Sequence, residues 1–200
     1  LSDGAGGLLW DFSLRTRRFI GRTSLPADLA FLMANQAHVG DGSLVLDPFC
    51  GTASTLLSCA RFGASVVGLD IDERTFSEAA TSAGERGSSG GVRSNFAQAS
   101  LPPPEALLVA DATRLLGGDD LLGEDRYFKF DAIVTDPPYG LLEGLGALYM
   151  PLALRVATLL SIAAARLRVG GTLVFLLPVP AATASPAGLE LREARGVTCA

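Results

Sequence analysis

The sequence predicts an α/β domain in which helices flank a central, mostly parallel β-sheet. Short apolar runs rich in β-branched residues alternate along the chain with segments of helical periodicity, which is typical of βαβ units. Four of these short runs end at an aspartate: Asp47, Asp70, Asp111 and Asp136. Ligands bind at the carboxyl ends of the strands in such sheets, so a binding site is expected there. A chain of 200 residues with 48% hydrophobic content suits one domain with a full core.

Charge and cysteine content argue against several classes of protein. The formal net charge of -5 makes the chain a poor nucleic-acid binder by itself, so most contacts to a polynucleotide substrate would come from elsewhere. The cysteines Cys50, Cys59 and Cys199 lack a Cys-x-x-Cys spacing, which argues against a disulfide framework and a zinc site and fits a reducing cytoplasm. His38 has no second histidine or cysteine nearby, so no metal site is predicted. No apolar run reaches the about 20 residues that a membrane helix needs.

The first part of the chain has two interpretations. Residues 8–20 form its most basic segment, with three arginines among aromatic and aliphatic residues. They fit either a basic strand near a nucleic-acid path or a solvated linker that emerges from an N-terminal domain, and the linker is favoured modestly. The predicted division is a linker over residues 1–18 and a catalytic domain over residues 19–200.

The segment after the first predicted strand, residues 43–47, is the expected ligand cradle. A tight turn of small residues leads into a helix, whose free backbone N–H groups point at whatever binds there. The turn has neither Gly-x-Gly-x-x-Gly nor Gly-Lys-Ser/Thr, so a dinucleotide fold is disfavoured and a P-loop nucleotidase is excluded. Asp70 ends the second strand, 23 residues after Asp47, which is the spacing at which an acid binds ribose hydroxyls. Asp111 ends the third strand and suits the amino group of an adenine.

The remaining elements follow from periodicity and turn signals. A hydroxyl cap at Thr23 or Ser24 with Pro26 in the first turn predicts the start of a helix. Helices are expected over residues 26–38, 73–85, 92–99 and 151–167, and strands over residues 66–69, 107–110, 130–135 and 172–177. Acidic residues 117–125 predict a surface loop, and glycine-rich residues 141–148 fit either a lid over the site or an ordinary connection.

The stretch after the fourth strand carries the chemistry. Asp136 is followed by Pro137, Pro138 and Tyr139. The prolines end the strand and hold the acid in extended geometry at its carboxyl end. A carboxylate and a rigid carbonyl can accept hydrogen bonds from an exocyclic amino group while the tyrosine ring stacks on the base. The four residues resemble the catalytic motif of S-adenosylmethionine-dependent methyltransferases that act on planar amino groups. Taken alone they fit equally well a strand that ends in a proline turn with a solvated aspartate.

A wider resemblance covers about residues 19–178. The chain resembles the catalytic subunits of eukaryotic tRNA (guanosine-10 N2) methyltransferases, in the Rossmann-like class I, THUMP-linked methyltransferase family. The matching segments occur in the correct order, at residues 20–24 (IGRTS), 31–37 (FLMANQA), 46–52 (LDPFCGT), 67–72 (VGLDID) and 130–140 (FDAIVTDPPYG). The resemblance implies methylation of the N2 amino group of a tRNA guanosine with S-adenosylmethionine as cofactor. It also implies a small zinc-binding activator protein as partner and an N-terminal RNA-binding THUMP domain.

The resemblance assigns roles to individual residues. The catalytic group is Asp136, Pro137, Pro138 and Tyr139, and the cofactor-binding group is Asp47, Phe49, Gly51, Thr52, Asp70, Ile71, Asp111 and Ala112. Asp47 would orient the methionine amino end of the cofactor, Asp70 its ribose and Asp111 its adenine.

Two departures from the family pattern leave alternatives open. Ala53 stands where the family has glycine, which costs roughly 1–2 kcal/mol if that backbone needs a positive φ. The antiparallel strand pair expected after the fifth strand is predicted to be truncated, which would leave a sheet edge exposed. The alternatives are a DNA adenine-N6 or cytosine-N4 methyltransferase, which shares the Asp-Pro-Pro-Tyr motif, and a non-catalytic scaffold that binds S-adenosylmethionine. Residues 33–37 (MANQA), in a predicted helix, favour tRNA as the substrate.

Overall fold

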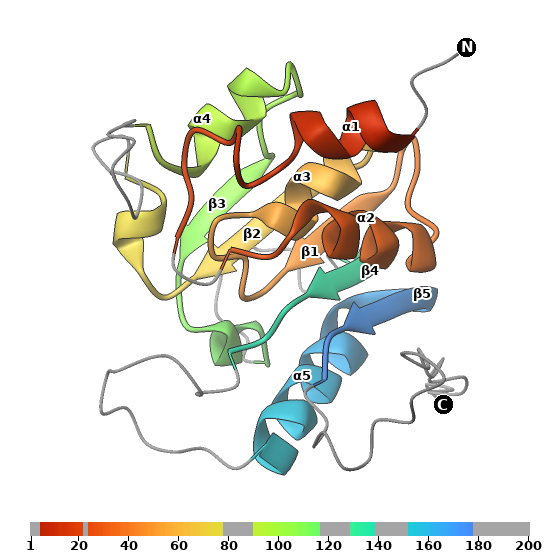
Figure 1. The fold of residues 1–200 in the computed structure, drawn as a ribbon. Coiled ribbons are helices and arrows are strands. Elements are labelled where there is room, and N and C mark those ends of the chain that lie inside the picture. The colour runs from red at the N-terminus through yellow and green to blue at the C-terminus, as the bar shows by residue number, and fades with distance from the viewer. Residues whose placement is uncertain (1–4, 22–23, 78–89, 117–128, 139–151, 178–200) are drawn as a thin grey trace, which may run out of the picture.

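The computed structural model describes residues 5–21, 24–77, 90–116, 129–138 and 152–177 and shows a five-stranded parallel sheet (Figure 1). The strands are β1 (Leu44–Asp47), β2 (Ser65–Asp70), β3 (Ala106–Val109), β4 (Phe130–Thr135) and β5 (Leu167–Phe175). Their order in the sheet is β3-β2-β1-β4-β5, and every neighbouring pair is parallel. The predicted α/β class and parallel sheet are therefore confirmed.

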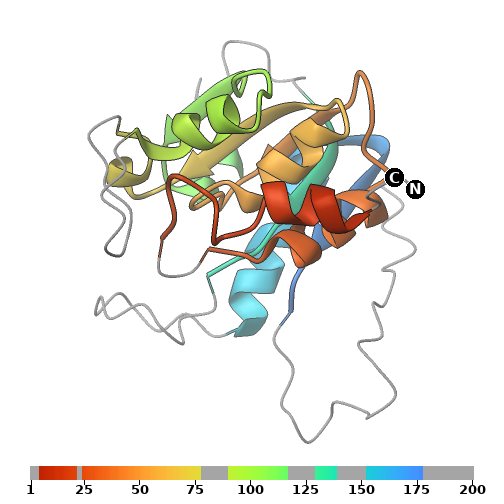
Figure 2. The same cartoon turned by 45° about the horizontal axis from the view of Figure 1, so that its top comes forward.

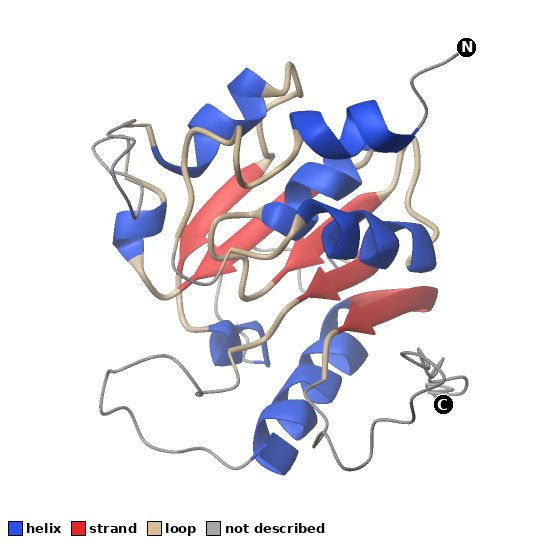
Figure 3. Cartoon of the chain, in the orientation of Figure 1, coloured by secondary structure: helices blue, strands red, loops and turns tan. Residues whose placement is uncertain are grey.

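The order of the strands places a reversal between β1 and β4. From β1 the chain moves outward through β2 to β3, then returns to add β4 and β5 on the other side of β1. The ends of β1 and β4 consequently flank the point at which open sheets of this kind bind ligands. The arrowheads of the strands all lie at the same edge of the sheet (Figure 3).

Helices cover both faces of the sheet, and each face has its own core. The described helices are α1 (Ala5–Asp11), α2 (Ala27–Gln36), α3 (Ser54–Arg61), η1 (Glu73–Thr75), α4 (Gly91–Gln98), η2 (Ala112–Leu116) and α5 (Leu152–Arg166). One core joins α2, α3 and α4 to the sheet through side chains such as Met33, Leu56 and Phe96. The other joins α5 and η2 to the opposite face through Leu115 and Ile162. Because apolar side chains alternate between the two faces along the strands, the sheet is buried on both sides, as parallel sheets are.

The basic segment after α1 packs onto the domain, so the solvated linker predicted for residues 1–18 is wrong for this part. Phe12 is buried and meets Phe31 of α2 edge to face, with 5.1 Å between the ring centroids. Arg17 is only 6% exposed and donates hydrogen bonds to Ser54 Oγ at 2.6 Å and to the Phe12 carbonyl at 3.1 Å. Phe12 and Phe19 of this segment therefore contribute to the core, whereas Trp10 is exposed, and the basic charge of the segment gave no sign of that burial.

Two side chains of α4 hold the next residues of the segment, which runs beside α4 in Figures 1 and 2. Asn95 Oδ1 accepts the backbone N–H of Phe19 and Asn95 Nδ2 donates to the Phe19 carbonyl, both at 2.8 Å. Gln98 accepts from the backbone N–H of Arg18 and donates to the Thr16 carbonyl, again at 2.8 Å. The two amides thus satisfy backbone groups that no strand partner satisfies.

The predicted cap of α2 is wrong. The helix begins at Ala27, its N-cap residue is Pro26, and no side chain caps it. Ser24 lies too far before the first turn, and its Oγ instead accepts the backbone N–H of Gly21 at 2.8 Å and pairs with Thr52 Oγ1 at 2.7 Å. The hydroxyl therefore ties the entry to α2 to the turn after β1.

Two other boundaries differ from the sequence-based ones. The described part of the helix predicted at residues 73–85 is the short 3-10 helix η1. The predicted turn before residue 172 is instead an irregular first part of β5, where the pairing with β4 shifts in register and Gly170 has φ +80°. Asp131 and Arg168 form an ion pair of 2.7 Å there. Residues 117–125, 141–148 and 178–200 lie outside the described residues, so the loop, the lid and the truncated strand pair stay predictions.

Within the described ranges, the search for a helix with the length and apolarity of a membrane span finds none.

Candidate active site

Asp47, the last residue of β1, is a buried carboxylate with three donors. It is 1% exposed. Its Oδ1 accepts from Thr135 Oγ1 at 2.6 Å and from the backbone N–H of Phe49 at 3.0 Å, and its Oδ2 accepts from Thr55 Oγ1. Burial raises the pKa of Asp47 to about 7, against the opposing effect of the three hydrogen bonds. The nearby carboxylate of Asp70 raises it further. This carboxylate thus joins β1, the turn, α3 and β4.

Asp70, at the end of β2, holds the turn from the other side. Its Oδ2 accepts the backbone N–H of Gly51 at 2.8 Å, and its Oδ1 accepts the backbone N–H of Asp72 at 2.9 Å. An ionised carboxylate has about four acceptor positions, so capacity remains for further donors. Gly51 has φ +47°, and a Cβ on it would meet no atom within 4 Å, so the space beside the turn is open. The arrangement fits a ligand with vicinal hydroxyls, such as the ribose of the expected cofactor.

A close approach between the turn and β2 fixes the shape of this cradle. The backbone N–H of Cys50 donates to the Leu69 carbonyl at 2.8 Å. A Cβ on Gly68 would lie 2.8 Å from both Cys50 Sγ and Leu56 Cδ1, which is closer than packing allows. Gly68 is therefore required for the turn to lie against the strand.

Ala53 adopts the left-handed backbone conformation. The sequence analysis predicted a free-energy cost at this residue if its φ were positive. It has φ +62° and ψ +34°, it is fully buried, and it is the N-cap residue of α3 without a side-chain cap. A residue with a Cβ costs roughly 1–2 kcal/mol in this conformation. The departure from glycine therefore introduces backbone strain beside the cradle.

The sequence analysis predicts an adenine site after the ends of β2 and β3, and these two ends lie next to each other. The backbone N–H of Ala110 donates to the Asp70 carbonyl at 2.9 Å, which joins the two strand ends. Asp111 is exposed, and its Oδ1 accepts from both the backbone N–H and the Oγ1 of Thr113 at 2.8 Å. Ile71 is 73% exposed, whereas Ala112 is buried. The site therefore offers an accessible apolar side chain and a carboxylate beside each other.

Asp136 follows β4 directly, on the other side of the strand reversal. It is half-buried, and burial raises the pKa of its carboxyl above the usual value. Pro137 is buried and Pro138 is exposed. The Pro138 carbonyl accepts a hydrogen bond from the Arg155 guanidinium of α5. Tyr139 lies outside the described residues, so its place beside Asp136 stays a prediction.

The predicted acids thus lie along one edge in sheet order: Asp111, Asp70, Asp47 and Asp136. Phe49 and Thr52 lie in the turn, and Thr52 contacts Ser24 rather than the backbone of the turn. Sequence reasoning missed the two hydroxyls that bind Asp47, those of Thr55 and Thr135. Thr135 ends an apolar strand, where a buried hydroxyl without a partner would be costly, and that conflict was the available signal. Thr55 lies in a helix of mixed composition, which gave no such signal.

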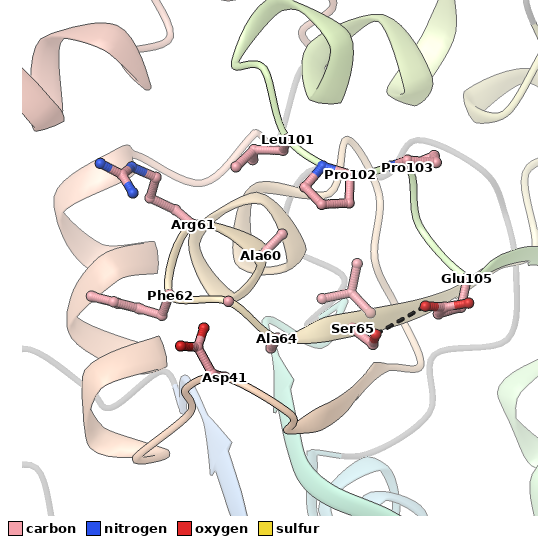
Figure 4. A pocket seen from close by; sticks show the side chains of 12 residues that line it. Asp41, Ala60, Arg61, Phe62, Ala64, Ser65, Leu101, Pro102, Pro103 and Glu105 are labelled. Carbon is pink, nitrogen blue, oxygen red and sulfur yellow. Dashed lines mark hydrogen bonds between the residues drawn. The ribbon is translucent and has the colours of Figure 1, made fainter.

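A pocket elsewhere in the described part of the chain contains none of the predicted site residues (Figure 4). It is lined by residues at the end of α3 and before β2 and β3, among them Arg61, Phe62 and Pro102. Ser65 donates a hydrogen bond to Glu105 at its wall, at 2.9 Å. This pocket lies at the amino ends of β2 and β3, the edge opposite the four acids.

Comparisons with known proteins agree with the fold. The chain is 38% identical over 148 residues to the tRNA (guanine(10)-N(2))-methyltransferase TRMT11 of Homo sapiens, covering 72% of this chain and 30% of that protein. It is 34% identical over 206 residues to the Rattus norvegicus protein of the same name, covering 90% and 43% respectively. The chain thus spans less than half the length of these relatives. The crystal structure of TrmN from Thermus thermophilus superposes with a TM-score of 0.54 at 28% identity, covering 78% of this chain and 40% of that one. Residues 15–178 match the model of the RMKL-like methyltransferase domain, UPF0020. The chain belongs to this methyltransferase family.

Proposed function

We propose that this chain is the catalytic part of an enzyme that transfers a methyl group from S-adenosylmethionine to the N2 amino group of a guanosine in tRNA, at position 10. The observation that carries the proposal is the position of Asp136. It follows β4 at the strand reversal, beside the cradle that Asp47 and Asp70 organise. The names of the relatives support the choice of substrate.

The residues present fit the cofactor. Asp70 keeps acceptor capacity for ribose hydroxyls, and the open space beside Gly51 admits a ligand close to the backbone of the turn. Ile71 offers an exposed apolar face for the adenine, and Asp111 a carboxylate for its amino group. Ala112, Phe49 and Thr52 complete the proposed cofactor-binding group. Asp47 already accepts three hydrogen bonds, so about one acceptor position would remain for the methionine amino end.

The reaction requires the protein to hold a weak nucleophile, the guanine N2 nitrogen, in line with the methyl group. S-adenosylmethionine, when bound, supplies an electrophilic methyl group on a sulfonium. The guanine N2 lone pair is delocalised into the ring, so its orientation matters most. The Asp136 carboxylate and the Pro137 carbonyl would accept hydrogen bonds from the two amino hydrogens, which favours a pyramidal nitrogen. As the N–C bond forms, the S–C bond breaks, a neutral thioether leaves, and the proton that nitrogen loses would pass to the Asp136 carboxylate. Tyr139 stacks on the guanine, which is flipped out of its helix.

Partners supply what the chain itself lacks. With a net charge of -5, it is poorly suited to hold the phosphates of tRNA alone. An RNA-binding domain of the THUMP type, which precedes the catalytic domain of residues 19–200 in the full-length protein, provides that affinity in this proposal, together with a small zinc-binding activator. A cytoplasmic location fits the two described cysteines, Cys50 and Cys59, which are buried and free.

The test is methyl transfer by the full-length protein with its activator. Labelled S-adenosylmethionine is incubated with a tRNA transcript, and the modified nucleoside is identified by mass spectrometry. We expect N2-methylguanosine, and no product from a matched transcript with inosine at position 10, which lacks the amino group. Label in the inosine transcript would contradict the target position, and methylated adenosine or cytidine would contradict the substrate class.

A further inference from the structure

Thr135 makes a contact that its place in β4 does not require. It is fully buried at the end of the strand and directly precedes Asp136. A hydroxyl at such a position costs free energy unless it is bonded, and valine would fill the same space in a strand. Threonine hydroxyls commonly bond nearby backbone. The Thr135 hydroxyl instead donates to the carboxylate of Asp47, 88 residues away, at 2.6 Å.

The acceptor of that hydrogen bond belongs to the proposed cofactor cradle. The other oxygen of Asp47 accepts from Thr55 of α3, and Oδ1 also accepts from the backbone of Phe49 in the turn. Because Asp47 is 1% exposed, water does not compete for these hydrogen bonds, and a hydrogen bond is electrostatically stronger in such surroundings than in water. One buried carboxylate therefore sets the end of β4 relative to the turn and to α3.

The backbone pairing alone leaves this end of β4 less constrained. In the register of β1 against β4, Val45 pairs with Ala132 and Leu46 with Ile133, so the paired part of β4 against β1 ends before Thr135. On its other side β4 pairs with β5 up to Thr135 and Phe175. The Thr135–Asp47 bond is the contact that continues the link between β1 and β4 beyond the paired residues.

We propose that Thr135 is a positioning residue for methyl transfer: through Asp47 it fixes the start of the Asp136–Pro137 acceptor pair relative to the cofactor turn. This inference rests on the function proposed above. In-line methyl transfer needs the nitrogen and the methyl carbon at a fixed separation. In this proposal the end of β4 positions the guanine nitrogen, and the turn after β1 positions the cofactor. Thr135 links them without touching either reactant.

The test compares three variants in the full-length protein with its activator. Thr135→Val removes the hydroxyl and keeps the shape, and Thr135→Ser keeps the hydroxyl. As the control for the substitution itself, Thr158→Val removes an exposed hydroxyl of α5 that donates to the Leu154 carbonyl of the same helix. For Thr135→Val we expect a kcat between about 10- and 100-fold lower, because a misplacement of about 1 Å can cost about 100-fold. The Kd for S-adenosylmethionine changes far less, Thr135→Ser restores most of kcat, and Thr158→Val matches the wild type.

A second measurement does not depend on activity. Hydrogen exchange without tRNA should become faster in Thr135→Val at both the end of β4 and the turn after β1, and remain unchanged in Thr158→Val. Faster exchange in β4 alone would overturn the proposed link. A kcat that falls only in proportion to the folded fraction would assign Thr135 to stability, and an equal loss of cofactor affinity would assign it to the cofactor pocket; each contradicts the inference. A wild-type protein that transfers no methyl group, with the exchange result as expected, would instead overturn the proposed function.

Discussion

The carboxylate of Asp70 accepts the backbone N–H of Gly51 at 2.8 Å, so the end of β2 and the turn after β1 form one unit. The same carboxylate accepts the N–H of Asp72 with its other oxygen. The acid proposed to bind the ribose is therefore oriented by the protein before any ligand arrives. A preoriented acceptor lowers the cost of ordering when the ligand binds.

Replacement of Asp70 by alanine should weaken binding of S-adenosylmethionine at least about tenfold. Hydrogen bonds to a charged group are each worth about 1.5–3 kcal/mol, and the variant loses those to the ribose as well as the one that holds Gly51. Isothermal titration calorimetry measures the affinity. Asp41→Ala, an exposed acid at the opposite edge of the sheet, is the control for the loss of one negative charge. Equal affinities for wild type and Asp70→Ala would remove Asp70 from the cofactor site.

Ala53→Gly should stabilise the protein by about 1 kcal/mol. Glycine adopts the observed φ of +62° without the clash of a Cβ, and the gain is reduced by the greater freedom of glycine in the unfolded chain. Chemical unfolding monitored by circular dichroism gives the difference. Ala157→Gly, at an exposed position inside α5, should instead cost about 1 kcal/mol. If both variants were destabilised equally, the backbone of Ala53 would carry no strain.

The burial of Asp47 should appear in the pH dependence of stability. Its pKa is raised to about 7 in the folded protein, from the usual value near 4 in the unfolded chain, so the folded state favours the protonated form. The stabilising contribution of this group is then full below about pH 4 and is lost as the pH rises to about 7. Asp47→Asn does not titrate. We therefore expect the unfolding free energy of the wild type, relative to the variant, to fall between these pH values and to level off above them. A relative stability that rises with pH would show that hydrogen bonds lower the pKa of Asp47 more than burial raises it.

The sequence predicted the parts of this molecule that depend on local pattern. β4 spans the predicted residues, and the four acids at the strand ends lie along one edge of the sheet. Both were predictable because the hydrophobic pattern and the length of a strand are local properties of the sequence. The same reasoning failed where tertiary contacts decide. The sequence predicted Arg17 as part of a solvated basic segment, yet its side chain is buried and donates a hydrogen bond to Ser54. Ser24 reads as a helix cap, yet it bonds to Gly21 and Thr52.

The candidate site shows the same division. Motif spacing predicted that Asp47 and Asp70 lie at the ends of neighbouring strands, because a strand followed by a tight turn and a helix gives a fixed geometry. It could not show which donors would satisfy Asp47, since Thr135 lies 88 residues away and the contact depends on which strands become neighbours. The positive φ of Ala53 could not be predicted from the residue itself. The glycine that the family has at this position indicated only that a positive φ was possible.

The central claim is that Asp136 acts in the chemical step and contributes little to cofactor binding. Asp136→Asn keeps the shape but places an amide where a charged acceptor was. The loss of an electrostatic contact that forms mainly in the transition state costs about 10²–10³ in turnover. The most direct measurement is therefore kcat for tRNA methylation by full-length wild type and Asp136→Asn with the activator, beside the Kd for S-adenosylmethionine from calorimetry. For Asp136→Asn we expect a kcat lower by that factor with nearly unchanged cofactor affinity; a variant that kept more than about a tenth of wild-type turnover would show that Asp136 has no such role.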